Sequence, residues 1–155
     1  MQIDQHSFHG LLHSADLIEA ELRRQLAPLG LQPRQARVLE AMGRMGPVSQ
    51  VDLAQAFDIT PASMSTMTDR LLDGGYITRT ISKTSRRQNV LELTDKGRTL
   101  LKGVADAWST VDQTIVTVLG ADAGALFELA SRLRDGLGGK IPGKRPRPAP
   151  DTQTE

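Results

Sequence analysis

The sequence predicts a mainly α-helical chain with one small β-hairpin, which is an α+β fold. Apolar residues recur at spacings of three and four along most of the chain, as in amphipathic helices. Only residues 76–82 and 89–93 alternate between apolar and polar side chains, as strands do. Breaks that contain Gly or Pro separate the helical stretches, so the 155 residues divide into six predicted helices and one hairpin.

The first two helices are predicted from apolar stripes that stop at helix breakers. The stripe over residues 6–27 stops at Pro28, and the stripe over 33–45 stops at Gly46-Pro47. The first stripe covers a wide face, which suits an interface with another helix.

A short helix and a capped longer helix follow, separated by a tight turn. The short helix spans "QVDLAQAF", residues 50–57, behind the predicted N-cap Ser49. Thr60 is the predicted N-cap of the next helix, 61–73, and Pro61 suits its first position. A helix, a turn of about four residues and a second helix form a helix-turn-helix.

The predicted hairpin directly follows this motif. Its two strands, 76–82 and 89–93, are joined by a polar tip that carries Lys83, Arg86 and Arg87. A hairpin in this position is a wing. An α-helix fits the major groove of DNA, and a β-ribbon reaches the neighbouring groove or backbone.

Two further helices complete the folded part of the chain. Thr94 is the predicted N-cap of a long helix over 94–119, and Asp122 is that of a last helix to residue 137. The long helix extends beyond what the small winged lobe can cover, so its apolar stripe predicts an interaction surface. The Gly- and Pro-rich end of the chain predicts a disordered tail.

Positive charge is concentrated around the hairpin, although the formal net charge of the chain is only +1. Residues 77–102 carry seven Lys or Arg against two acids, a balance of +5. Residues 1–60 and 103–139 balance at −2 and −3. A local basic patch is typical of phosphate contact, and a solvated hairpin that binds nothing would show the same charge.

The helix over 61–73 presents small hydroxyl side chains on the side opposite Met64, Met67 and Leu71. Such side chains approach phosphates and base edges closely. Capping and solvation alone would also account for any single Ser or Thr. The predicted DNA-binding residues are Thr60, Pro61, Ala62, Ser63, Ser65, Thr66, Arg70, Lys83, Arg86 and Arg87.

Two stretches, "VSQVDLAQAFDITPASMSTMTDRLLDGGYITR" and "SRRQNVLELTDKGRTLL", carry a family pattern. They contain Asp69-Arg70-Leu71, Gly75-Tyr76-Ile77 and the run Leu93-Thr94-Asp95-Lys96-Gly97. Over about residues 6–138 the sequence resembles the MarR (multiple antibiotic resistance regulator) family of bacterial winged-helix transcription factors. Two positions depart from the family pattern, since Ser85 replaces the acid of the wing tip and Thr66 replaces a common basic residue.

The resemblance implies a homodimer in which the first helix and the last two helices intertwine. Such a dimer binds double-stranded DNA at a pseudo-palindromic operator, with half-sites about 10 bp apart. The resemblance also implies a repressor, or occasionally an activator, that a small aromatic or anionic organic effector releases. The expected parts are an N-terminal dimerisation helix (1–30), a winged helix-turn-helix DNA-binding lobe (31–93), C-terminal dimerisation helices (94–138) and a disordered tail (139–155).

Two weaker patterns concern ligands. Trp108 and Arg37 are candidates for an effector pocket, and a core tryptophan and a solvated arginine fit the same sequence. His6, His9 and His13 share one helical face, which makes His9 and His13 weak candidates for a metal or pH sensor. Solvation or a dimer contact explains these histidines more simply. No cofactor is expected.

Other classes of protein are disfavoured by the sequence. It contains no Cys, which excludes disulfides and thiolate metal sites. No nucleophile with a base, phosphate loop or carboxylate pair indicates an enzyme. No apolar run approaches transmembrane length and no signal-peptide pattern is present, so we expect a soluble cytoplasmic protein without a membrane partner. The remaining alternative is a winged-helix module for protein–protein assembly that does not act on DNA.

Overall fold

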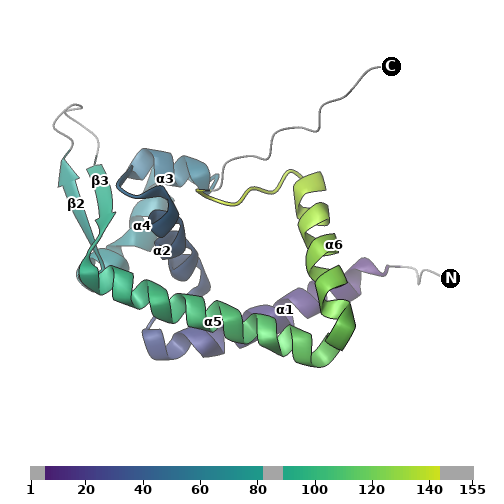
Figure 1. Ribbon diagram of the computed structural model, residues 1–155. Coiled ribbons are helices and arrows are strands. Elements are labelled where there is room, and N and C mark those ends of the chain that lie inside the picture. Colours follow the sequence, from purple (N-terminus) through teal and green to yellow (C-terminus); the bar gives the residue numbers. More distant parts are fainter. Residues whose placement is uncertain (1–5, 82–88, 144–155) are drawn as a thin grey trace, which may run out of the picture.

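The computed structural model describes residues 6–81 and 89–143. Its elements in chain order are α1 (Phe8–Leu26), η1 (Ala27–Leu29), α2 (Pro33–Met45), β1 (Val48–Ser49), α3 (Gln50–Ala56), α4 (Pro61–Asp73), β2 (Ile77–Ile81), β3 (Asn89–Leu93), α5 (Asp95–Leu119), η2 (Gly120–Asp122) and α6 (Ala123–Gly136). In Figure 1, α2, α3, α4 and the strands gather into one lobe, and α5 leaves this lobe alongside α1 toward α6. This mainly helical fold with a small antiparallel sheet confirms the predicted winged-helix class.

Side-chain caps set the starts of the helices in the lobe. The Oγ of Ser49 accepts a hydrogen bond from the backbone N–H of Asp52 at 3.0 Å, which begins α3. Thr60 caps α4 in the same way, and Thr94 caps α5. Asp122 stands at the N-cap position of α6 but makes no side-chain cap, because its backbone is already helical within η2.

The sheet contains one strand that the sequence did not predict. Its order is β1-β3-β2, and both pairs are antiparallel. β1 is only two residues long, and Val48 pairs with Leu91 while Ser49 pairs with Val90. A strand of two residues is too short to show an alternating pattern, so it can be identified only from its pairing with β3.

The core lies where α2, α3, α4, β3 and α5 meet. Leu39, Leu53, Met64, Leu91 and Val104 are each fully buried there. Burying a large apolar side chain contributes about 1.5–3 kcal/mol, so this cluster stabilises the lobe and orients α4.

By contrast, α1, the far end of α5 and α6 keep large apolar side chains in solvent. Within α1 only Leu26 is buried, and within α6 only Ala123 is buried. The exposed large apolar side chains of these helices are Phe8, Leu11, Leu12, Leu17, Ile18, Val116, Val118, Leu119, Leu129 and Leu133, and Leu137 directly after α6 is exposed as well. Amphipathic helices with an uncovered apolar face are interaction surfaces.

The stretch Asp95–Gly136 is long and apolar enough, by length and composition alone, to cross a membrane. This differs from the expectation that no apolar run approaches that length. The stretch is not one continuous helix, because α5 ends at Leu119 and Gly120 adopts a positive φ of 57°. Figure 1 shows the resulting bend between α5 and α6, which suits a helical interface better than a membrane span.

The chain returns to the lobe after α6, along the yellow segment in Figure 1. Arg44 of α2 donates to the backbone carbonyl of Pro142 from Nη2 at 2.7 Å and from Nε at 3.2 Å. Pro142 is buried, and Lys140 lies 3.6 Å from a carboxylate oxygen of Asp58. The first part of the expected tail, residues 139–143, therefore lies against the lobe, and the rest is outside the described residues.

Candidate nucleic-acid interface

The second helix of the helix-turn-helix, α4, is held at its start by a network of hydroxyl groups. The Oγ1 of Thr60 accepts from the backbone N–H of Ser63 at 3.1 Å and donates to the Oγ of Ser63 at 3.0 Å. Gln50 of α3 donates to the carbonyl of Pro61 at 3.3 Å, which ties the two helices together. Asp58 closes the turn between them with a positive φ of 52°.

The two sides of α4 are divided much as the sequence predicted. Met64 and Leu71 are buried, Met67 is half-buried, and Thr68 is buried with its Oγ1 donating to the carbonyl of Met64 at 3.0 Å. Ser65 is half-buried, so it is the least accessible of the predicted contacts on this helix. The exposed predicted residues are Thr60, Pro61, Ala62, Ser63, Thr66 and Arg70.

The hydroxyl groups on the exposed side have local partners but retain bonding capacity. Thr66 donates from Oγ1 to the carbonyl of Ala62 at 3.3 Å, and the residue is exposed. A hydroxyl offers one donor and two acceptor positions, so it can bond a base edge or phosphate in addition. The side chains therefore have the chemistry that base readout requires.

An open hollow lies between α3 and the start of α4. Its volume is about 680 Å³, and its lining includes Val51, Gln55, Thr60 and Ser63. Several of the predicted contact residues thus share one concave surface. Asp58 and Ile59 of the turn also line this hollow.

The wing is joined to α4 by a contact between charged side chains. Arg79 of β2 lies 3.7 Å from Asp69 of α4, measured from Nη2 to Oδ1. Arg79 was not among the predicted DNA-binding residues, although it lies in the basic segment that the charge balance identified. The predicted tip residues Lys83, Arg86 and Arg87 lie outside the described residues.

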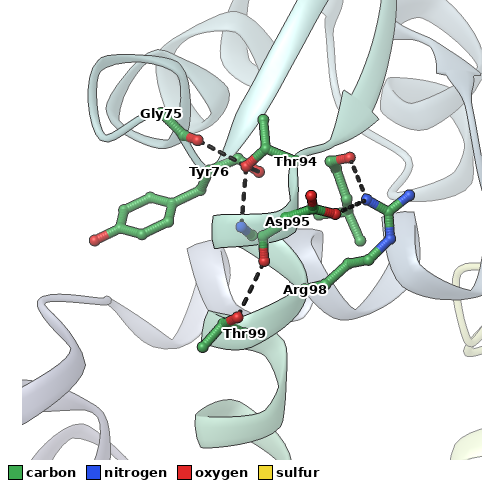
Figure 2. Close-up of polar contacts among 8 residues, drawn as sticks. Gly75, Tyr76, Thr94, Asp95, Arg98 and Thr99 are labelled. Carbon is green, nitrogen blue, oxygen red and sulfur yellow. Dashed lines mark hydrogen bonds and ion pairs between the residues drawn. The ribbon is translucent and has the colours of Figure 1, made fainter.

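The root of the wing is built around Thr94 (Figure 2). Its Oγ1 donates to the carbonyl of Gly75 at 2.7 Å and accepts from the backbone N–H of Gly97 at 3.0 Å. Lys96 donates to the carbonyl of Gly74 at 2.7 Å, and its Nζ lies 4.7 Å from the ring centre of Tyr76. The end of α4, the start of β2 and the start of α5 are therefore locked together.

Gly97 has a steric role at the same place. A Cβ atom added there would lie 2.0 Å from the carbonyl oxygen of Tyr76. The first turn of α5 is therefore packed directly against the backbone that links α4 to the wing. The contact leaves no room for a side chain at position 97, three residues after Thr94, so only glycine fits there.

The weaker ligand candidates lie apart from this surface. Trp108 is half-buried against the core, whereas Arg37 is exposed and lines a separate pocket of about 230 Å³ that Trp108 does not line. His9 and His13 are exposed on α1. Within residues 6–81 and 89–143, no group of three His, Asp or Glu side chains is placed to hold a metal ion.

Comparison with known proteins agrees with this architecture. A family model described as "MarR family" matches residues 29–88, which span the helix-turn-helix and most of the wing. The chain is 29% identical over 105 residues to HTH-type transcriptional repressor Rv2887 of Mycobacterium tuberculosis, covering 68% of this chain and 76% of that protein. It is 30% identical over 80 residues to transcriptional repressor MdtR of Bacillus subtilis, covering 52% of each chain.

A solved structure shares most of the fold, beyond the lobe alone. The transcriptional repressor CouR, bound to a 23-mer DNA duplex, matches with a TM-score of 0.75 and 26% identity over 82% of this chain and 91% of CouR. The matched family model, the related repressors and the shared architecture agree: the chain is similar to the MarR family, in sequence over residues 29–88 and in fold over most of its length.

Proposed function

We propose that this protein is a transcriptional regulator that binds double-stranded DNA in a sequence-specific manner. The observation that carries the proposal is the exposed hydroxyl face of α4, with the wing tied to it through Asp69 and Arg79. An α-helix in the major groove reads base edges, and an attached wing contacts the flanking backbone or minor groove. Thr60, Pro61, Ala62, Ser63, Ser65, Thr66 and Arg70, with Lys83, Arg86 and Arg87 of the tip, remain the proposed contacts.

The acting form in this proposal is a homodimer. Leu11 and Leu17 on α1, Val118 on α5 and Leu133 on α6 are each more than half exposed in the single chain. A second copy that intertwines these helices would remove this apolar surface from water. Residues 1–30 and 94–138 are thus the proposed dimerisation parts, and 31–93 the proposed DNA-binding part. A two-fold dimer would bind a pseudo-palindromic operator with half-sites about 10 bp apart.

We propose repression as the sign of regulation, because the relatives Rv2887 and MdtR are named transcriptional repressors. A small organic effector that changes DNA affinity, a cytoplasmic location and the absence of catalytic activity complete the proposal. The similarity to the MarR family supports each of these three points. A DNA partner further supports the cytoplasmic location.

Fluorescence anisotropy on a labelled fragment of the protein's own promoter region tests the function. We expect tighter binding to this fragment than to a scrambled duplex of equal length, with affinity falling steeply as salt rises. Sedimentation of the free protein should give a dimer mass. Absent or salt-insensitive binding would favour the alternative, a winged-helix module for protein assembly.

A further inference from the structure

We propose that residues 138–143 form a strap that holds the winged lobe at a fixed angle to α6 and thereby restricts which spacing of DNA half-sites the protein accepts. The strap leaves the end of α6 and reaches α2 and the turn before α4, along the yellow segment in Figure 1. Its anchors on the lobe, its defined departure from α6 and the ring that it closes support this role. Docking of the strap is independent of DNA, whereas its effect on half-site spacing rests on the proposed function.

The main anchor of the strap is the backbone carbonyl of Pro142, a buried residue. Arg44 of α2 donates to this carbonyl from Nη2 at 2.7 Å and from Nε at 3.2 Å. The remaining nitrogen of the guanidinium, Nη1, lies 3.1 Å from Oε1 of Glu40, one turn earlier on the same helix. Glu40 therefore holds the guanidinium from the other side, and the planar fork presents two donors to one acceptor. The position of Pro142 on α2 is thus defined by side chains of α2 itself.

The backbone of the strap touches α2 directly at Gly143. A Cβ atom added there would lie 2.9 Å from Cγ of Met45 and 3.3 Å from Cβ of Arg44. Gly143 also adopts a positive φ of 76°, a conformation that favours glycine. An alanine at this position is therefore unfavourable both in backbone conformation and in packing, which makes Gly143 a second anchor.

A third contact places the strap beside the helix-turn-helix. Nζ of Lys140 lies 3.6 Å from Oδ1 of Asp58, which closes the turn before α4. Both side chains are mostly exposed, so this ion pair adds little to stability. It does show that the strap reaches the turn that leads into α4.

The strap also leaves α6 in a defined direction. Gly138 has a φ of 79° and donates to the carbonyl of Asp135 at 3.1 Å, and Gly139 donates to the carbonyl of Arg134 at 2.8 Å. Bonds of this kind satisfy the last carbonyls of a helix and fix how the chain departs from it. The strap is therefore held at both ends, and its six residues can span at most about 20 Å.

Together with α5, the strap closes a ring. Figure 1 shows the lobe and α6 on opposite sides, joined by α5 along one edge and by the strap along the other. A long helix can curve, so α5 alone leaves freedom in the angle between the lobe and α6. The strap removes part of this freedom. In the proposed homodimer α6 belongs to the dimerisation part, so the strap limits the distance between the two α4 helices.

This limit matters because half-site spacing on DNA changes in discrete steps. One base pair moves a half-site by about 3.4 Å and rotates it by about 34° around the duplex. Lobes held at a fixed angle cannot follow such a step, so the DNA must be twisted at a cost in affinity. Lobes released from the strap can follow it.

Zero-length cross-linking of the free, full-length protein tests the docking. A carbodiimide activates the carboxylate of Asp58, the amine of Lys140 attacks it, and an amide forms as the carbodiimide leaves as a urea. Equal amounts of ¹⁴N and ¹⁵N protein are refolded together, so the mass of the linked peptides tells whether both residues belong to one chain. We expect a link between Lys140 and Asp58 within one chain. No link, or links of mixed isotope composition, would overturn docking of the strap on its own lobe.

Matched variants test the two anchors. Arg44→Ala removes both donors to Pro142, and Gly143→Ala adds a methyl group where there is no room, so each should lower the yield of the link several-fold. Lys102→Ala removes an exposed positive charge from α5, and Gly136→Ala adds a methyl group in open space just before the strap. Both controls should keep the wild-type yield. A wild-type yield in both Arg44→Ala and Gly143→Ala would overturn the assigned anchors.

DNA anisotropy with operators of altered spacing is a separate measurement. One base pair inserted between the half-sites should weaken wild-type binding about tenfold, and Arg44→Ala and Gly143→Ala should each reduce this ratio to about twofold. The ratio distinguishes the strap from a direct phosphate contact, whose loss would lower the affinity for both operators equally. A wild-type ratio in both variants would overturn the effect on spacing. Failure of the wild type to bind DNA would contradict the proposed function and leave the cross-linking result standing.

Discussion

Arg79 on the first strand of the wing lies 3.7 Å from Asp69 on the second helix of the helix-turn-helix. Along the chain these two elements are connected by Gly74, Gly75 and Tyr76, so the contact adds a constraint on the direction of the wing to those at its root. Both side chains are at least one-third exposed. Ion pairs in such a setting contribute about 0–1 kcal/mol to folding, so the contact matters for orientation and electrostatics more than for stability.

Replacing Asp69 should alter how the affinity for DNA depends on salt concentration. In Asp69→Asn, one negative charge near the phosphates is lost and Arg79 is free to contact the backbone. We expect tighter binding to scrambled DNA and a salt-dependence slope steeper by about 1. The control Asp73→Asn removes an exposed acid near the far end of α4 and should change the slope less. Identical slopes in both variants would mean that Arg79 stays away from the DNA.

Thr94 should stabilise the fold through the hydrogen bonds of its hydroxyl. Thr94→Val keeps the β-branched shape but loses the helix cap and the bonds to the carbonyls of Gly75 and Tyr76, so we expect a loss of about 1–2 kcal/mol in unfolding free energy. Urea unfolding at a fixed protein concentration measures this loss, because the proposed dimerisation would make stability depend on concentration. The control Thr99→Val loses only the exposed bond to Asp95, 3.1 Å long, and should cost much less.

Gly97 should tolerate no side chain. Alanine there would place its Cβ 2.0 Å from the carbonyl oxygen of Tyr76, which forces the backbone apart. We expect Gly97→Ala to lower the unfolding free energy by at least about 2 kcal/mol. Gly136→Ala, at a helical position with open space around it, should change stability by less than about 1 kcal/mol. Similar melting temperatures for the two variants would refute the proposed close packing.

Base readout should depend on the exposed hydroxyls of α4. We expect Ser63→Ala or Thr66→Ala to change which operator variants are preferred, with a cost of about 1–3 kcal/mol at one base position. Binding to a set of single-base operator variants measures this preference. An equal loss of affinity for every sequence, in both variants, would place base readout elsewhere.

The arginines of the wing tip should contribute affinity without specificity. Arg87 matches the wing arginine of the family, so it is the first candidate and Arg86 the second. Arg87→Ala should weaken specific and scrambled DNA about equally and reduce the salt-dependence slope by about 1. Slopes equal to wild type in both Arg86→Ala and Arg87→Ala would show that the tip does not touch DNA.

The sequence by itself determined the helices, the hairpin and the exposed side of α4. Apolar periodicity and caps such as Thr60 and Thr94 act between residues three or four positions apart, so a local pattern records them. For the same reason, helical spacing alone assigns Met64 to the core and Ser63 to the surface, and both lie where this spacing puts them.

Tertiary structure alone decided the contacts between distant segments. The strand β1 exists because Val48 meets Leu91, and the C-terminal segment docks because Arg44 reaches Pro142, 98 residues away. The contact of Arg79 with Asp69 likewise follows from how helices and strands pack. So does the position of Asp58, which lines both the hollow at the start of α4 and the pocket beside Arg37. No repeating local pattern encodes such pairs, because their partners are selected by the shape of the assembled core rather than by neighbours along the chain.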